Sequence, residues 1–284
     1  MATFSFQQVD VFASAPLKGN PLAVVIGADA LSDATMAALA NWTNLSETTF
    51  LLRPTNPAAD YRVRIFTPER ELPFAGHPTL GSCQVWLNSG GKPKAKHNAE
   101  TIVQECAAGL IQIRRDGERL AFAAPPLLRS GDVDRAVLRS IANGLRIRED
   151  AIRASQWADN GPGWAAVMLA SRAEILALQP DYPTLAELKI GVVAPWDAAK
   201  DGTDVQFEVR AFVPTRATED PVTGSLNAGL AQWLIGKGLA PDRYVAAQGT
   251  ALGRAGRVFV QREGNDIWIG GRTITCIEGK LDLA

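Results

Sequence analysis

Cysteine and histidine are scarce in this chain of 284 residues, which holds three cysteines and two histidines. The cysteines, Cys83, Cys106 and Cys276, are too few and too widely spaced for a disulfide framework, and this usage suits a reducing compartment such as the cytoplasm. The histidines, His77 and His97, form no close cluster with one another or with the cysteines. No metal-ligand spacing is present, so we expect no metal site.

A basic excess and a long apolar run are also missing. The 29 basic and 30 acidic residues give a formal net charge of -1, which argues against nucleic acid as a partner. No run of about 18 apolar residues exists, so no membrane-spanning helix is expected. The start of the chain, Met1 to Asp10, lacks the basic and apolar regions of a secretory signal. These absences favour a cytoplasmic protein and rank nucleic acid low as a partner.

The apolar content is sufficient for more than one core. Hydrophobic residues make up 46% of the chain and charged residues 21%, and the length suits two domains of about 140 residues each. The proline pair Pro125-Pro126 and the polar stretch around Ser130-Gly131-Asp132 indicate the crossing between them. We therefore expect domains at 1–124 and 130–271, with a strand at about 272–284 that returns to the first domain.

Local patterns predict many strands and few helices. Alternating or Thr-rich apolar segments predict strands at 4–11, 22–26, 48–52, 61–66, 101–105, 110–114, 120–123, 164–169, 205–213, 257–261, 266–269 and 273–277. Helices are expected after Ser32 as N-cap and over 78–87, 133–142 and 225–235. A dinucleotide fingerprint at Gly249 to Gly256 is disfavoured, because its spacing is wrong and a strand pattern follows it.

The two halves of the chain share a repeated segment. The stretch 64–70 resembles 210–216, and Pro73, Gly76 and Gly81 are matched in order by prolines and glycines at 221, 224 and 229. Each half thus contains a strand, a Phe-x-Pro-x-Arg turn, Pro-x-x-Gly and a helix. Free N–H groups and the positive end of each helix dipole favour an anion, most simply a carboxylate. Two ordinary capped helices are the alternative.

These motifs resemble the PhzF family of phenazine-biosynthesis-like isomerases, which has the diaminopimelate-epimerase-like fold. The matching stretches are 10–13, 19–21, 44–50, 64–68, 71–78 and 219–225. The resemblance implies an α+β fold of two pseudo-symmetric domains, each a central helix wrapped by a strongly bent, mostly antiparallel sheet. It also implies an active site in the cleft between the domains, a homodimer, and proton transfer without cofactor or metal.

The resemblance further implies the roles of particular residues in this sequence. Glu47 would be the single acid/base, His77 and Asp220 would bind and polarise the substrate, and Ser46, Gly76, Gly224 and Ser225 would bind it. The residues themselves agree on chemistry, since a carboxylate that acts first as base and then as acid needs a pKa raised by partial burial. Apart from the resemblance, Glu47 also fits an exposed glutamate at a strand edge.

Ala75 and Thr223 occupy the two positions at which epimerases of this fold carry paired cysteines. Neither side chain titrates usefully, so two-thiol racemisation is disfavoured. Glu219 and Asp220 lack a third ligand for a metal, and Asp220 also fits a role as partner of a helix dipole. The main prediction is a cofactor-independent isomerase acting on a small carboxylate-bearing substrate. The alternatives are a non-catalytic small-molecule-binding or interaction protein and a one-base epimerase or racemase.

Overall fold

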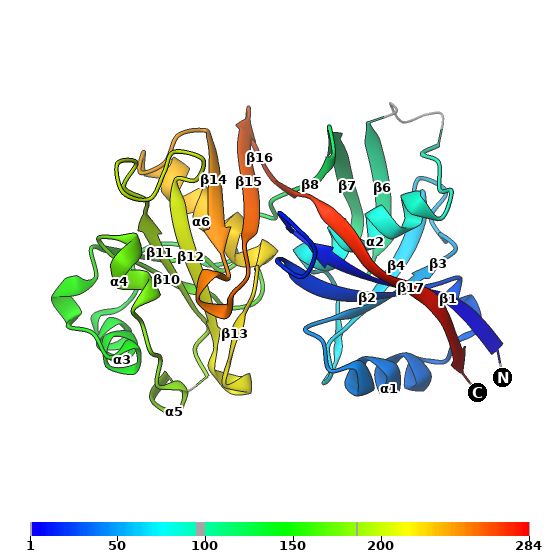
Figure 1. The fold of residues 1–284 in the computed structure, drawn as a ribbon, viewed down its shortest axis with the longest axis horizontal. Coiled ribbons are helices and arrows are strands. Elements are labelled where there is room, and N and C mark those ends of the chain that lie inside the picture. Colours follow the sequence, from blue (N-terminus) through cyan, green and yellow to red (C-terminus); the bar gives the residue numbers. More distant parts are fainter. Residues whose placement is uncertain (1, 95–99, 186, 284) are drawn as a thin grey trace. The chain divides into compact units, whose positions relative to one another are not determined.

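The computed structural model describes residues 2–94, 100–185 and 187–283 (Figure 1). His97 and residue 284, which entered the sequence analysis, lie outside the described residues. Contacts divide the chain into two compact units, residues 1–123 with 270–284 (unit 1) and residues 124–269 (unit 2). None of the described helices is long and apolar enough to cross a membrane.

Unit 1 is a bent sheet around one helix. Its strands are β1 (Ala2–Val11), β2 (Asn20–Ile26), β3 (Thr48–Leu52), β4 (Tyr61–Phe66), β5 (Glu71–Leu72), β6 (Thr101–Cys106), β7 (Gly109–Asp116), β8 (Arg119–Ala123) and β17 (Thr273–Leu283). β1 pairs antiparallel with both β17 and β2, and β2 pairs parallel with β3. β4 lies between β3 and β6, and it pairs antiparallel with β3 and parallel with β6. The sheet continues antiparallel through β7 to β8.

The central helix of unit 1 is α2 (Gly76–Asn88), which contacts β1, β2, β3 and β8 (Figure 1). All residues from Gly76 to Cys83 are buried. A Cβ on Gly81 would lie 2.5 Å from Leu22 Cδ2, so the glycine is what lets the helix approach the strands this closely. The shorter α1 (Asp33–Thr43) follows η1 (Ala28–Ala30) and has the predicted cap, since the Ser32 hydroxyl accepts from the Thr35 N–H at 3.1 Å.

Unit 2 repeats this plan. Its strands are β9 (Ala154–Trp157), β10 (Ala165–Met168), β11 (Ile190–Pro195), β12 (Phe207–Val213), β13 (Thr218–Asp220), β14 (Arg243–Gln248), β15 (Gly256–Glu263) and β16 (Asp266–Gly271), which crosses into unit 1. β9 and β10 pair antiparallel, β10 and β11 parallel, β11 and β12 antiparallel, β12 and β14 parallel, and β14 and β15 antiparallel. The strands from β1 to β7 pair in the same succession. The central helix α6 (Gly224–Gly236) is the counterpart of α2.

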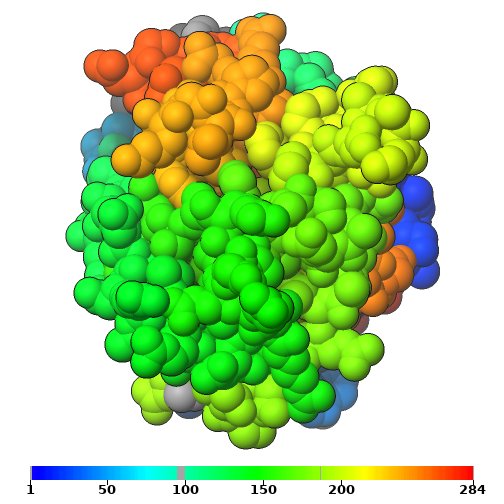
Figure 2. Space-filling model, turned by 90° about the vertical axis from the view of Figure 1, so that its left-hand side faces the viewer, coloured from blue at the N-terminus to red at the C-terminus, as the bar shows by residue number. Residues whose placement is uncertain are grey.

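Further helices lie outside this repeated frame. They are α3 (Arg135–Leu145), η2 (Glu149–Ala151), α4 (Arg172–Leu176), α5 (Tyr182–Leu185), η3 (Pro214–Arg216) and η4 (Thr250–Leu252). Figure 2 shows the green segment that carries α3 and α4 on one face of unit 2. Beneath it lies an apolar core that includes Ile141, Val167, Val192 and Phe212.

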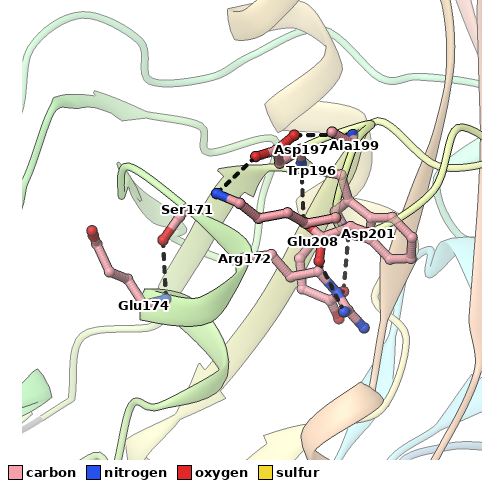
Figure 3. A network of polar contacts seen from close by, with 9 residues as sticks. Ser171, Arg172, Glu174, Trp196, Asp197, Ala199, Asp201 and Glu208 are labelled. Atoms are coloured by element: carbon pink, nitrogen blue, oxygen red, sulfur yellow. Dashed lines mark hydrogen bonds and ion pairs between the residues drawn. The ribbon is translucent and has the colours of Figure 1, made fainter.

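A charged network ties α4 to β12 (Figure 3). The side chain of Glu208 is fully buried on β12, and its Oε2 accepts from Arg172 Nε at 3.2 Å and from Trp196 Nε1 at 3.1 Å. The Arg172 guanidinium also lies 4.3 Å from the centre of the Trp196 ring and 3.3 Å from Asp201 Oδ1. Burial of a carboxylate is costly unless it is paired, and this arginine supplies the pairing charge.

Three helix starts differ from prediction, that of α6 by one residue only, since it begins at Gly224. α2 begins at Gly76, so Pro78 is the third helical residue and still lies in the first turn, where an N–H has no helical partner. α3 begins at Arg135 and ends at Leu145, later than the predicted 133–142. The reason is that Val133 packs in the core before the helix, while Ile141 and Leu145 bury its last turns.

The strand registers relate the units residue by residue. Phe66 lies opposite Thr48, and Phe212 opposite Ile190. The repeated segment equates Phe66 with Phe212, so Thr48 corresponds to Ile190. The residue before each strand then corresponds as well, which makes Lys189 the counterpart of Glu47.

Candidate active site

Glu47 and His77 lie together in unit 1. Glu47 follows α1 and directly precedes β3, and His77 is the second residue of α2. Glu47 Oε2 lies 3.3 Å from His77 Nε2, and the side chains are 15% and 5% exposed. The predicted partial burial of Glu47 is therefore confirmed. Ser46 precedes Glu47 in the same loop and is partly buried.

The imidazole of His77 is neutral at physiological pH. Burial lowers the pKa of His77 to about 3, because the charged form loses its hydration. Burial is the cause of this lowered pKa, although the Glu47 carboxyl group lies 3.3 Å away. The contact thus joins a carboxyl group to a neutral ring nitrogen and is not an ion pair.

The N-terminus of α2 has no capping side chain among the described residues. Its N-cap is Ala75, in an extended conformation, and the first turn contains no acidic residue. The Thr79 N–H already donates to the Ala75 carbonyl at 3.1 Å. Gly76 and His77 are the first two residues of this helix, and N–H groups at such positions have no acceptor within the helix and can bind an anion.

The N-terminus of α6 in unit 2 is held by a different network. The N-cap Thr223 does not cap the helix with its side chain, because its hydroxyl donates to Asp220 Oδ2 at 2.5 Å and accepts from Gln248 Nε2 at 2.9 Å. Gln248 Oε1 in turn accepts from the Thr223 N–H and from Asn227 Nδ2. The structure therefore brings Asp220 to the start of α6 and fixes it there. Gln248 and Asn227 were not anticipated from the sequence.

Ser225 is the second residue of α6, as His77 is of α2. Its hydroxyl oxygen accepts from Trp164 Nε1 at 3.1 Å, and its carbonyl accepts from Asn160 Nδ2 at 2.9 Å. Trp164 and Asn160 were missed in the sequence as site residues. The sequence offered one local indication of these residues, the Asn160-Gly161-Pro162-Gly163 turn directly before Trp164.

The segment before each helix is held by an arginine. Arg210 on β12 contacts both oxygens of Glu219, the residue before Asp220, at 3.0 and 2.7 Å. Arg64 on β4 makes the equivalent contacts to Glu71 at 2.7 and 2.6 Å. The sequence analysis considered Glu219 and Asp220 as a weak candidate for a metal site. In the structure the Glu219 carboxylate forms an ion pair with Arg210. No cluster of three or more potential metal ligands occurs in the part of the chain that the structure describes.

The predicted site residues fall into two groups. Ser46, Glu47, Gly76 and His77 lie in unit 1, and Asp220, Gly224 and Ser225 lie in unit 2. Cys83 is buried within α2, where burial raises the pKa of its thiol to about 12, as expected for a packed and unreactive cysteine. The glycine-rich segment after Gly249 leads into the strand β15, so it is not a dinucleotide fingerprint.

Comparisons with known proteins bear on this arrangement. Residues 9–279 match the family model described as phenazine biosynthesis-like protein (PhzC-PhzF). Antisense-enhancing sequence 1 of Schizosaccharomyces pombe is 36% identical, over 99% of this chain and 99% of its own length. Trans-2,3-dihydro-3-hydroxyanthranilate isomerase of Pseudomonas aeruginosa is 34% identical, over 90% of this chain and 89% of its own length.

Solved structures show the same fold. A phenazine biosynthesis protein of the PhzF family from Enterococcus faecalis has a TM-score of 0.81 at 27% identity, covering 99% of this chain and 100% of that chain. A hydroxyproline epimerase from Agrobacterium vitis has a TM-score of 0.57 at 14% identity, covering 98% and 92%. The second likeness concerns the fold alone.

Fold and relatives define an isomerase-class enzyme with an epimerase-like fold. The chain belongs to the phenazine biosynthesis-like protein family. The predicted family, fold class and enzyme class are confirmed, and the roles of the individual site residues stay predictions.

Proposed function

We propose that this protein is a cofactor-independent isomerase that shifts a proton on a small carboxylate-bearing substrate, with Glu47 as the single acid/base. The observation that carries the proposal is the contact of Glu47 Oε2 with His77 Nε2 at 3.3 Å, beside the uncapped start of α2. A partly buried carboxyl group next to backbone donors is suited to moving a proton at carbon.

In the proposed reaction the Glu47 carboxylate removes a proton from one carbon of the substrate. The C–H bond breaks as the O–H bond forms, and the electron pair moves into the substrate's conjugated system. The Glu47 carboxyl group then returns a proton to a second carbon, which regenerates the carboxylate. A neutral His77 suits this cycle, because an imidazolium at 3.3 Å would make Glu47 a weaker base.

The substrate class rests on the two helix N-termini and on the named relative. Trans-2,3-dihydro-3-hydroxyanthranilate, the compound in the name of the Pseudomonas aeruginosa relative, carries a carboxylate. We propose that His77 and Asp220 bind and polarise a substrate of this kind, and that Ser46, Gly76, Gly224 and Ser225 also bind it. The family resemblance also supports a cytoplasmic homodimer, and sedimentation equilibrium tests the dimer.

Solvent exchange tests the function. The wild-type protein is incubated in heavy water with trans-2,3-dihydro-3-hydroxyanthranilate and a panel of cyclic amino and hydroxy acids, and deuterium at carbon is followed by NMR. We expect label to enter with isomerisation, and Glu47→Gln to lower the rate at least about a hundredfold. The matched control is Glu278→Gln, an exposed carboxyl group on β17, which should keep the wild-type rate.

Three outcomes would overturn the proposal. Near-normal turnover by Glu47→Gln would remove Glu47 from the acid/base role. Inversion of a stereocentre without a shift of the double bond would identify a one-base epimerase. A panel compound that binds tightly in calorimetry and never exchanges would identify a binding protein.

A further inference from the structure

A cavity of about 420 Å³ lies in unit 1, at the end of α2 opposite to Gly76 and His77. Its walls come from the last turns of α2, the hairpin of β7 and β8, and the residues at the start of β17, and α2 contacts both β8 and β17 (Figure 1). The volume is in the range of small-molecule sites, and none of the predicted site residues is among the described residues that line it. The cavity is therefore a candidate for a second binding site.

Arginine dominates the charge of this cavity. Arg115, Arg119 and Arg272 line it, and Glu118 is the one acidic residue among the described lining residues. Arg119 Nη2 lies 2.9 Å from Asp116 Oδ2, and Arg272 Nη2 lies 3.1 Å from Glu118 Oε2. The guanidinium of Arg115 forms no hydrogen bond or ion pair with the residues that the structure describes. The cavity wall thus carries one positive charge for which the described residues provide no partner.

The ion pair of Arg272 is one that a ligand can displace. The side chains of Arg272 and Glu118 are 48% and 79% exposed, and exposed ion pairs contribute little because water solvates both charges. An anionic group with several acceptor oxygens can accept from two arginines at once, whereas Glu118 contacts only Arg272. Arg272 can therefore turn from Glu118 to a bound anion and join Arg115.

The remaining lining is mainly polar. Gln84 and Asn88 present amide groups from α2, where Gln84 Nε2 donates to Asn88 Oδ1 at 2.8 Å. Thr273 also lines the cavity, and its Oγ1 is buried without a hydrogen-bond partner among the described residues. A buried hydroxyl without a partner is uncommon, and an anionic oxygen is a suitable acceptor for its proton. This lining suits a hydrophilic ligand that carries an anionic group.

We propose that this cavity binds the phosphate group of a small hydrophilic phosphate ester, with Arg115 and Arg272 as the groups that hold it. Arginine suits phosphate because its planar guanidinium donates two parallel hydrogen bonds to phosphate oxygens. A phosphate monoester carries a charge of about -1.5 to -2 at pH 7, which matches one arginine without a partner and one recruited from a weak ion pair. The site lies within unit 1 and does not depend on the proposed isomerase function.

Calorimetry with glycerol 3-phosphate tests the site, with glycerol as the uncharged match and glycerate as the carboxylate match. We expect the wild type to bind glycerol 3-phosphate more tightly than glycerate and to show no binding of glycerol. Arg115→Gln should weaken binding of glycerol 3-phosphate about tenfold or more, as expected for the loss of one charge-assisted contact. The matched control is Arg53→Gln, an exposed arginine of unit 1 outside the described lining, which should bind as the wild type does.

Glu118→Gln gives a result that a folding defect cannot imitate. Glu118 competes with the ligand for Arg272, so removal of its charge should strengthen binding by about threefold. Arg272→Gln should weaken binding. The matched control for charge is Glu278→Gln, an exposed carboxyl group on β17 outside the described lining, which should leave the affinity unchanged.

Four results would overturn the site. A wild-type protein without saturable binding of glycerol 3-phosphate at millimolar concentrations would remove it. Equal affinities for Arg115→Gln and Arg53→Gln would show that the ligand binds elsewhere. Weaker binding by Glu118→Gln would contradict the recruitment of Arg272, and tighter binding of glycerate would contradict the choice of phosphate. Isotope exchange that is lost in Glu47→Gln is measured separately, so either proposal can fail while the other stands.

Discussion

Arg64 in unit 1 and Arg210 in unit 2 hold equivalent positions. Each donates two hydrogen bonds to the carboxylate of the glutamate in the short strand that follows. Their surroundings differ. The Arg64 and Glu71 side chains are 24% and 35% exposed, and Arg64 also contacts the exposed Asp33. The Arg210 and Glu219 side chains are 6% and 4% exposed. One repeated ion pair is thus a half-exposed contact in one unit and a buried contact in the other.

The surroundings decide what each pair contributes. Arg210 Nη1 donates to the carbonyls of Ile175 and Leu178, so the guanidinium also joins α4 and the chain after it to the sheet. A buried charge without its partner is much more costly than an exposed one, because water cannot replace the partner. Glu219 directly precedes Asp220, so the buried pair also fixes the segment that leads to α6.

The largest expected effect is on stability. Arg210→Met should lower the free energy of unfolding by about 3 to 5 kcal/mol, because Glu219 stays buried without its charge partner. Arg64→Met, the matched change in unit 1, should cost about 1 kcal/mol or less. Urea denaturation monitored by circular dichroism measures both. Equal losses for the two variants would show that burial does not separate the two pairs.

The next effect concerns the networks at the helix starts. Thr223→Ala gives unit 2 the alanine that unit 1 has at Ala75, and it removes contacts to Asp220 and Gln248. We expect a loss of about 1 to 3 kcal/mol in stability, since the hydroxyl's partners stay buried (Gln248) or partly buried (Asp220). Thr203→Ala, at an exposed loop position of unit 2, should change stability little in the same urea series. A Thr223→Ala protein as stable as the wild type would contradict the network.

The last effect is a dependence of stability on pH. His77 has a pKa of about 3 when folded and an ordinary value of 6.5 when unfolded, so the unfolded state binds its proton first. Stability from this group is therefore present above pH 6.5 and is lost as the pH falls towards 3, by up to about 1.4 kcal/mol per pH unit. Subtracting the urea series of His77→Gln from that of the wild type isolates this slope. An unchanged slope in the variant would mean that His77 is not kept neutral by burial.

Much of the frame could be predicted from local pattern. The bounds of β3 and β4 agree with the predicted 48–52 and 61–66, because short Thr-rich or alternating segments between loops leave little choice. The repeat correctly located two central helices with equivalent N-termini. Glu47 and His77 were known to belong together only through the family resemblance.

Other parts depended on tertiary contacts that no local pattern encodes. β11 was not predicted, because its residues from Ile190 to Ala194 are all buried and show no alternation. A Cβ on Gly191 would lie 2.3 Å from the Leu226 side chain, so the close packing of Leu226 requires glycine at this position. The Trp164–Ser225 bond joins residues far apart in sequence. Without β11 the equivalence of Lys189 to Glu47 could not be seen.

The central claim is that one carboxyl group, that of Glu47, both removes and returns the proton. The most direct measurement uses trans-2,3-dihydro-3-hydroxyanthranilate deuterated at the carbon that loses its proton, turned over once in ordinary water and read by mass spectrometry and NMR. A single partly buried acid/base predicts that part of the deuterium reappears at the receiving carbon, and that Glu47→Gln abolishes both turnover and transfer. Complete loss of the label, with turnover preserved in Glu47→Gln, would contradict the account.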